Sequence, residues 1–346
     1  MSPTGALEIT IVIVAHGRPE VLRKTLADLA RCDQPDWFRG TIVVENGPPC
    51  GMAAVISEFQ DRLRIQHETI ASPKKTMALN HALRRLGRGW ALFIDDDVRV
   101  NPNWITVYTT AIAAEPERYY FGGPTSVDYE QRPPEWLIPY LPASARGLEF
   151  PDSVTAIRYP ECFLGFNWAA RVDDLLLAGG FSEDFGPGTL SGGGDESFMQ
   201  LQLCQTGLQG RVLSSALVWH QIPTNRCSPA WSLKRSYSGG LTAGIEAAWH
   251  EQKNKRWCAA IRCHIRHLRN RLGSMPIREV VQLSASGRFW MQRTIQWMLG
   301  FHEGYRLQGT THVFPSTNTA ATHMTASRSI PSNACSTPER SSGSPL

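Results

Sequence analysis

The sequence lacks several features that mark common protein classes. No stretch approaches the roughly 20 consecutive apolar residues that span a bilayer. The apolar run at residues 9–15 has no basic flank and is too short for a signal peptide. The eight cysteines include no CxxC pair and no regular spacing, which favours reduced thiols in a cytoplasmic protein over a disulfide framework. The net charge is only +4, so we expect no nucleic-acid partner.

Two phosphate-binding signatures and one phosphatase motif are missing as well. The first apolar run is followed by AHGRPE, where a dinucleotide-binding domain needs GxGxxG, and no P-loop GxxxxGK[ST] occurs. An aspartyl-phosphate phosphatase would carry DxDx[TV] near its N-terminus. The acidic triplet of this chain lies late in the first half and has Arg99 at the fifth position of that motif. These three classes are therefore excluded.

What the sequence does contain is an alternation of strand and helix patterns. Residues 8–15 and 90–94 are apolar runs typical of strands covered on both faces, and 41–46 is a similar run between them. Pro19 stands where a helix can begin, and residues 75–87 repeat apolar positions at helical spacing up to Gly87. This alternation predicts an α/β fold with a parallel sheet.

Polar residues follow three of these strands. They are His16-Gly17-Arg18, Glu45-Asn46-Gly47 and Asp95-Asp96-Asp97. The carboxyl ends of parallel strands lie along one edge of an open α/β sheet, where ligands bind, so we expect a site there. The three adjacent carboxylates repel one another. Either they form a solvated turn, or a divalent cation turns their repulsion into shared attraction.

From about residue 8 to 240 the chain resembles the nucleotide-sugar glycosyltransferases of the GT-A fold, specifically the inverting group called family 2. The motifs that carry the resemblance are, in chain order, ITIVIVAHGRPEVLRKTLADL, TIVVENGP, KTMALN, FIDDDV, GFNWAAR, AGGFSEDFGPG, GGGDESF and WHQIP. The resemblance implies a GT-A type, mostly parallel central sheet flanked by helices. It also implies inverting transfer of a sugar from a nucleoside-diphosphate sugar to a hydroxyl group.

The acidic triplet corresponds to the DxD motif of that family. Asp95 and Asp97, two apart on an extended chain, point to the same side and can share a Mn²⁺ or Mg²⁺ ion that also binds the donor diphosphate. The late strand ends in His220, which either adds an imidazole ligand, favouring Mn²⁺, or is a core group with its own partners. Asp96 either contacts the ribose or is solvated.

The resemblance assigns nucleotide-sugar contacts to Ala15, Glu45, Lys75, Asp95 and Asp96. Glu45 stands where the family usually has Asp, although it is also a natural turn residue before Asn-Gly. Lys75, or the neighbouring lysine, contacts base or diphosphate, or is simply a basic residue at a helix start. The family's usual Thr-Tyr-Asn after the first strand is replaced here by a sequence containing His-Gly, so nucleoside recognition differs.

Inversion in a single displacement requires a base that deprotonates the acceptor hydroxyl. Asp195 and Glu196 follow a glycine run and precede a helix. The family usually reads Glu-Asp there, with the second residue as base, so Glu196 is the candidate by position and Asp195 the neighbour that could replace it. The alternative is helix capping, which suits both residues.

We divide the chain into a catalytic domain at 1–240, a basic helical extension at 241–309 and a disordered tail at 310–346. Within the catalytic domain, 1–100 is the nucleotide-binding half and 101–240 the acceptor half. Between residues 253 and 293 there are ten basic residues and one glutamate. Trp257, Ile261, Ile265, Leu268 and Leu272 share one helical face there, and Trp290, Trp297 and Phe301 share another further on. These helices either lie on an anionic membrane surface or pack onto the catalytic domain.

The sequence thus predicts a metal-dependent inverting glycosyltransferase of surface polysaccharide or glycolipid synthesis. Its acceptor is a glycan or a lipid-linked sugar. The enzyme is cytoplasmic, either free or peripheral on the inner face of the membrane. Two alternatives stay open: a non-catalytic GT-A protein that binds a glycan or a partner, and a sugar nucleotidyltransferase on a similar sheet.

Overall fold

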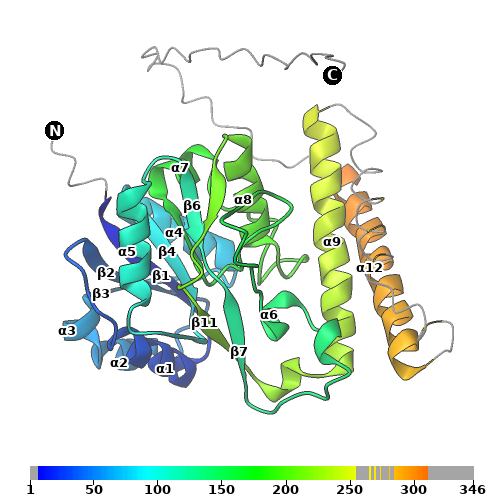
Figure 1. Ribbon diagram of the computed structural model, residues 1–346, viewed down its shortest axis with the longest axis horizontal. Coiled ribbons are helices and arrows are strands. Elements are labelled where there is room, and N and C mark those ends of the chain that lie inside the picture. Colours follow the sequence, from blue (N-terminus) through cyan, green and yellow to red (C-terminus); the bar gives the residue numbers. More distant parts are fainter. Residues whose placement is uncertain are drawn as a thin grey trace, which may run out of the picture. The chain divides into compact units, whose positions relative to one another are not determined.

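The computed structural model describes residues 7–254 and 284–310, together with positions 265, 269, 273 and 280. An eight-stranded sheet with the order β3-β2-β1-β4-β9-β6-β10-β8 forms its centre (Figure 1). In chain order these strands are β1 (Ile9–Ala15), β2 (Phe38–Asn46), β3 (Ile65–Ile70), β4 (Trp90–Asp95), β6 (Tyr119–Gly122), β8 (Ala156–Ile157), β9 (Trp168–Arg171) and β10 (Gln209–Val212).

The N-terminal half of the sheet is parallel. β1 pairs in parallel with β2 and with β4, and β2 pairs in parallel with β3. β9 then runs antiparallel between β4 and β6, and β10 runs parallel to β6. The predicted strands are confirmed, and β2 begins three residues before the predicted range because Phe38 is buried within it. The mostly parallel α/β architecture is therefore confirmed.

Helices cover both faces of the sheet, as alternating side chains require. Ile11 and Ile13 of β1 belong to a core shared with α1 (Pro19–Leu29), α2 (Met52–Ser57) and α5 (Trp104–Ala114). Val12 and Val14 belong to a second core on the opposite face. It is shared with α4 (Lys75–Leu86), α7 (Val172–Leu177) and α8 (Asp195–Gln205). The short α3 (Gln60–Leu63) leads into β3. The result is a three-layer fold with β1 buried on both sides.

A second, three-stranded sheet positions the late histidine. Its order is β5-β11-β7, with β5 (Val98–Val100), β7 (Thr125–Tyr129) and β11 (Val218–Ile222). β11 pairs antiparallel with β5 in a register that sets His220 opposite Val98. Since β5 starts directly after the acidic triplet, this register carries His220 to the end of β4.

The proline-rich segment 132–151 is more ordered than its sequence suggests. It contains a 3-10 turn at Ile138–Tyr140 and the short helix α6 (Ala143–Arg146). Leu137 and Leu141 are buried in a cluster with Ile222 of β11. The many prolines therefore shape a packed connection, and its helix α6 lies beside β7 and β11. A further 3-10 turn at Thr224–Arg226 leads out of β11.

Two long helices end the described chain, α9 (Pro229–Asn254) and α12 (Ala285–Thr310), and Figure 1 shows them side by side. Trp297 and Phe301 of α12 are buried against Ala243 and Ala247 of α9, so this predicted aromatic face packs internally. Glycines permit a backbone contact between the helices. A Cβ on Gly240 or Gly244 of α9, or on Gly300 or Gly304 of α12, would lie 2.0–2.2 Å from a carbonyl oxygen of the other helix.

The expected boundary at residue 240 falls inside α9, which runs through it without a break. Of the predicted apolar face formed by Trp257, Ile261, Ile265, Leu268 and Leu272, only Ile265 lies within the described residues. Residues 311–346 lie outside them as well. Within the described ranges, no helix combines the length and apolar character needed to cross a membrane.

Candidate active site

A cavity of about 650 Å³ opens at the carboxyl ends of β1, β2 and β4. Most of the predicted site residues line it, although they are far apart in the sequence. Its polar lining consists of His16, Arg18, Asn46, Lys75, Asp95, Asp96, Asp97, Ser144, Asp195, Glu196, His220, Arg226 and Arg235. The sheet edge, α8, β11 and α9 all contribute to this one space.

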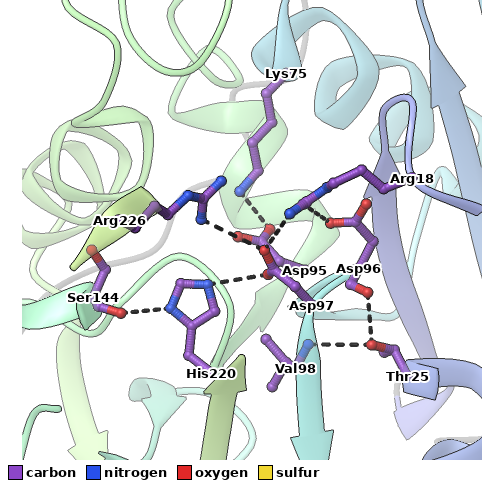
Figure 2. A network of polar contacts seen from close by, with 10 residues as sticks. All are labelled: Arg18, Thr25, Lys75, Asp95, Asp96, Asp97, Val98, Ser144, His220 and Arg226. Carbon is purple, nitrogen blue, oxygen red and sulfur yellow. Dashed lines mark hydrogen bonds and ion pairs between the residues drawn. The ribbon is translucent and has the colours of Figure 1, made fainter. Parts of the chain in front are cut away.

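The most deeply buried ion pair in the cavity joins Asp97 to His220. The Nε2 atom of His220 lies 3.1 Å from Oδ1 of Asp97, and both side chains are almost completely buried. On the other side of the ring, Nδ1 lies 2.5 Å from the backbone oxygen of Ser144 in α6 (Figure 2). A carbonyl oxygen only accepts, so Nδ1 is the donor. The segment 132–151 thus fixes the orientation and tautomer of His220.

Asp95 and the base candidates share a lysine. Nζ of Lys75, at the start of α4, lies 2.6 Å from Oδ1 of Asp95 and 4.0 Å from Oδ2 of Asp195. Burial alone would lower the pKa of Lys75, yet the carboxylates of Asp95 and Asp195 raise it well above its usual value. Lys75 therefore stays charged between the two acidic groups. The neighbouring Lys74 is turned outward, and its Nζ donates to the Glu183 backbone oxygen at 3.3 Å.

Arg18, in the loop after β1, bridges the other two aspartates. One of its guanidinium nitrogens contacts Asp96, and Nη1 donates to Oδ2 of Asp97 at 2.8 Å (Figure 2). Arg226 approaches the same Oδ2 of Asp97 at 3.6 Å. Asp97 thus meets two arginines and an imidazole. Arg18 is among the polar residues predicted at this sheet edge, but its contacts with Asp96 and Asp97 do not follow from the sequence.

These partners separate the protonation of two adjacent aspartates. Burial opposes ionisation of Asp97, but the hydrogen bond and charge of His220, together with Arg18, hold its pKa well below the usual range. Burial and the neighbouring charge of Asp97 raise the pKa of Asp96 to about 7, with Arg18 acting in the opposite direction. The Asp96 backbone oxygen also accepts from Thr25 of α1 at 2.8 Å. Asp97 is therefore the more firmly ionised member of this pair.

The base candidates lie at the first turn of α8. Gly194, with φ of 87°, occupies the N-cap, so Asp195 is the first helical residue and not the cap itself. Burial and repulsion from Asp195 raise the pKa of Glu196 to about 8, and Lys75 acts against this rise. A base is most effective when its pKa lies near the working pH. The environment of Glu196 meets that condition.

Ala15 and Glu45 do not line the cavity. Ala15 is fully buried at the end of β1 between the cavity residues Val14 and His16. The Glu45 carboxylate accepts from the Cys50 backbone nitrogen at 2.8 Å, and its other oxygen lies 3.2 Å from Nε2 of His67. In its place Asn46, the next residue of β2, faces the cavity.

The donor set around Asp97 fits a divalent cation. A protonated His220 donates Nε2–H to Oδ1 of Asp97 at 3.1 Å, which is the contact that lowers the pKa of Asp97; a neutral ring, with Nδ1–H committed to Ser144, would instead aim its Nε2 lone pair at that oxygen. Two acceptors at that distance need a proton or a cation between them, and a metal-binding histidine commonly donates its other N–H to a carbonyl. Asp95 is engaged by Lys75. Among the residues that the structure describes, no three acidic, His or Cys side chains are already grouped at metal-binding positions.

The comparisons with known sequences point to one family. The family described as "Glycosyl transferase family 2" matches residues 10–170. The succinoglycan biosynthesis protein ExoM of Rhizobium meliloti (strain 1021) is 27% identical over 253 residues, which cover 70% of this chain and 76% of that protein. The matched family segment includes β1, β4 and the acidic triplet.

Solved structures share the fold. A mannosyltransferase from Pyrobaculum calidifontis, PcManGT, in complex with GDP-Man and Mn²⁺ superposes with a TM-score of 0.56 at 15% identity, covering 86% of each chain. GalNAc-T7 with UDP, GalNAc and Mn²⁺ gives a TM-score of 0.53 at 13% identity, covering 89% of this chain and 58% of that one. The fold is therefore that of the GT-A glycosyltransferases.

Proposed function

We propose, from the match of residues 10–170 to glycosyl transferase family 2, that the protein is a metal-dependent inverting glycosyltransferase. Its donor is a nucleoside-diphosphate sugar and its acceptor a hydroxyl group of a glycan or lipid-linked sugar. PcManGT with GDP-Man and Mn²⁺, and GalNAc-T7 with UDP, GalNAc and Mn²⁺, have the same fold, which supports this donor class and this cofactor.

One observation carries the proposal. The ionised Asp97, paired with an oriented His220, faces the same cavity as the carboxyl pair Asp195 and Glu196. A transferase needs a group that stabilises a leaving diphosphate and a group that accepts a proton from the nucleophile. The two acidic clusters supply these two functions within one space of suitable size for a nucleotide sugar.

Asp95, Asp97 and His220 would hold the metal, which is Mn²⁺ or Mg²⁺. When bound, such an ion neutralises the charge that develops on the leaving diphosphate, as a Lewis acid does. Lys75 and Arg226 bring further positive charge to the same end of the cavity. Asp96 keeps the triplet in place through its backbone contact with Thr25.

Glu196 acts on the acceptor. Its carboxylate removes the proton of the acceptor hydroxyl while the hydroxyl oxygen attacks the anomeric carbon. The bond from that carbon to the β-phosphate oxygen breaks, and the nucleoside diphosphate leaves with the bonding electron pair. Attack from the face opposite the leaving group inverts the anomeric configuration. Asp195, beside Lys75, keeps a negative charge next to Glu196 and so raises its basicity.

The name of the ExoM relative refers to succinoglycan biosynthesis, which supports a pathway of the same kind. We infer a role in making a surface polysaccharide or glycolipid. Such a role places the enzyme in the cytoplasm, and a lipid-linked acceptor would bring it to the inner face of the membrane as a peripheral protein.

Calorimetry with UDP and GDP, with and without Mn²⁺, tests the donor site. We expect the wild type to bind at least one nucleotide only when Mn²⁺ is present, and Asp97→Asn to lose this binding by roughly 100-fold or more, since a metal ligand is removed. Asp173→Asn, which changes an exposed carboxylate near Arg171, should bind like the wild type. Metal-independent binding, or no binding by the wild type, would contradict the proposal and favour a non-catalytic protein.

A further inference from the structure

A second cavity, of about 320 Å³, lies between α1 and the ends of β7 and β11. Arg18 and Asp97 are the only described residues that line both this cavity and the main one, which holds the candidate active site. On β11, His220 lines the main cavity and Gln221 lines the second, because neighbouring residues on a strand point to opposite sides. The contact between Arg18 and Asp97 is therefore a wall common to both cavities.

Gln221 gives the second cavity a hydrogen-bond donor that the protein itself leaves unused. Its backbone nitrogen donates to the Asp97 backbone oxygen at 2.8 Å, which fixes the residue beside the acidic triplet. Its side-chain Nε2 is buried and has no hydrogen-bond partner among the described residues. A buried donor without an acceptor is costly, so a ligand that supplies an acceptor oxygen would satisfy it.

Lys24 of α1 brings a positive charge to the same cavity. Its neighbour Arg23 pairs with Glu20 and Glu58. Lys24, in contrast, is exposed and forms no ion pair within 4 Å with any residue that the structure describes. Its ammonium group is therefore available to an anionic ligand.

Two exposed carboxylates also line the second cavity, and each already has a partner. Oδ2 of Asp128 lies 3.3 Å from Nη1 of Arg99. Oε2 of Glu130 accepts from the backbone nitrogen and the hydroxyl of Thr224, at 2.8 and 3.0 Å. The other oxygen of each carboxylate can accept a hydrogen bond from a ligand hydroxyl. The cavity thus offers acceptors for hydroxyl groups as well as the charge of Lys24 for an anion.

The size and walls of the second cavity suit a single sugar ring. Its volume lies at the lower end of the range for small-molecule pockets. Tyr129, Ile222 and Pro223 supply apolar surface, and the hydroxyl of Tyr129 donates to the Ala145 backbone oxygen at 2.7 Å, which holds the ring in place. Apolar walls beside carboxylate and amide groups match a molecule with C–H faces and hydroxyl edges.

We propose that the second cavity binds a monosaccharide that carries an anionic group, either a phosphate ester or a carboxylate. The anionic group accepts from Nε2 of Gln221 and meets the charges of Lys24 and Arg18. The sugar hydroxyls donate to Glu130 and to the neighbouring carboxylate of β7. This site is separate from the cavity of the proposed function and does not depend on it.

Occupancy of the second cavity acts on the main cavity through Arg18. Figure 2 shows Arg18 and His220 on opposite sides of Asp97. Nη1 of Arg18 donates to Oδ2 of Asp97 at 2.8 Å, and an anion in the second cavity competes for this guanidinium. When Arg18 turns toward the anion, Oδ2 of Asp97 is freed for a cation, so the sugar and the metal strengthen each other's binding. This coupling, unlike the site itself, rests on the proposed function.

Calorimetry in EDTA, without divalent metal, tests the site with glucose 1-phosphate, glucuronate, glucose and inorganic phosphate. We expect the wild type to bind one of the two anionic sugars, which distinguishes a phosphate from a carboxylate, and to bind glucose and inorganic phosphate roughly tenfold more weakly or worse. Gln221→Leu should weaken binding of that sugar about tenfold, because one hydrogen bond to a buried group is lost. Lys24→Gln should weaken it several-fold. Lys234→Gln, which changes an exposed lysine that lines neither cavity, should bind like the wild type.

The melting temperature of each variant should match that of the wild type, which shows that weaker binding does not come from unfolding. If the wild type bound neither anionic sugar, or if Gln221→Leu and Lys24→Gln both bound it unchanged, the inference would be overturned.

A Mn²⁺ titration of the nucleotide-free protein, with and without the bound sugar, tests the coupling. We expect the sugar to tighten Mn²⁺ binding a few-fold, and this gain should vanish in Arg18→Gln and in Gln221→Leu. A gain that persisted in Gln221→Leu would come from sugar in the main cavity and would contradict the coupling. If the sugar bound in EDTA but no nucleotide bound with Mn²⁺, the second site would stand and the proposed function would fall.

Discussion

The two acidic clusters of the cavity have similar composition and opposite surroundings. Asp95, Asp96 and Asp97 are met by Arg18, Lys75, His220 and Arg226. Among the described residues, the only cationic nitrogen as close as 4.0 Å to Asp195 is Nζ of Lys75, and none lies that close to Glu196. Both clusters consist of adjacent carboxylates, so their composition alone does not distinguish them.

The difference in partners sets what each cluster can hold. The cations keep Asp97 ionised, so its end of the cavity can bind a metal and a diphosphate. Burial and repulsion from Asp195 raise the pKa of Glu196 to about 8, so that end can accept a proton. One buried carboxyl cluster is thus prepared to bind positive charge and the other to carry a proton at neutral pH.

Removing the proton acceptor should have the largest effect. Glu196→Gln keeps the shape of the side chain, and we expect the rate of donor turnover to fall by roughly 10²–10⁴. Binding of UDP or GDP with Mn²⁺ should stay as in the wild type, because the Asp97 end is untouched. Release of nucleoside diphosphate from the sugar nucleotide measures the rate, and Glu183→Gln, an exposed change in the preceding loop, is the control. An unchanged rate would show that Asp195 or another group is the base.

A smaller effect is expected in the dependence of kcat/KM on pH. A base with a pKa near 8 must lose its proton to work, so kcat/KM should rise as pH increases through about 8. Lys75 lowers the pKa of Glu196, and Lys75→Gln should therefore move the rising limb to higher pH. Lys74→Gln, whose ammonium points away toward Glu183, should leave the limb in place. A shift to lower pH in Lys75→Gln would contradict this account.

The smallest effect is expected at Arg18. Its guanidinium occupies Oδ2 of Asp97, so it competes with a metal for this carboxylate. Arg18→Gln should tighten binding of Mn²⁺ to the nucleotide-free protein by a few-fold, which a Mn²⁺ titration can detect; the pair is partly exposed, so the gain is modest. Arg23→Gln on α1, which breaks exposed pairs with Glu20 of the same helix and with Glu58 just after α2, is the matched control. Weaker binding in Arg18→Gln would mean that Arg18 positions Asp97 for the metal.

The sequence predicted the sheet edge well because the pattern there is local. Continuous apolar runs marked β1 and β4, and the polar residues after them necessarily fall at the carboxyl ends of parallel strands. The DxD resemblance and the helix starting at Lys75 placed Asp95, Asp97 and Lys75 correctly in one cavity. The late strand was predicted correctly, but it does not end at His220: β11 runs from Val218 to Ile222, and His220 is its central residue.

The partners of these residues could not be predicted in the same way. Ser144 and His220 are 76 residues apart, and Arg18 and Asp97 are 79 apart, so only the folded chain brings them together. The choice between Glu45 and Asn46 depended on which face of β2 meets the cavity, and a strand buried on both faces gives no alternation from which to read it. The proline-rich segment concealed α6 because its order comes from packing on Ile222 of β11 rather than from helix propensity.

The glycines at the contact between α9 and α12 affect how rigid the cavity wall on the α9 side is. Where side chains separate two helices, rotamer changes let them slide; here backbone meets backbone, and a slip of one residue would drive a Cβ into a carbonyl. α9 also carries Trp231 and Arg235 to the cavity wall. The two helices therefore fit together in one register, and the glycines at their contact fix the position of the cavity wall that Trp231 and Arg235 form.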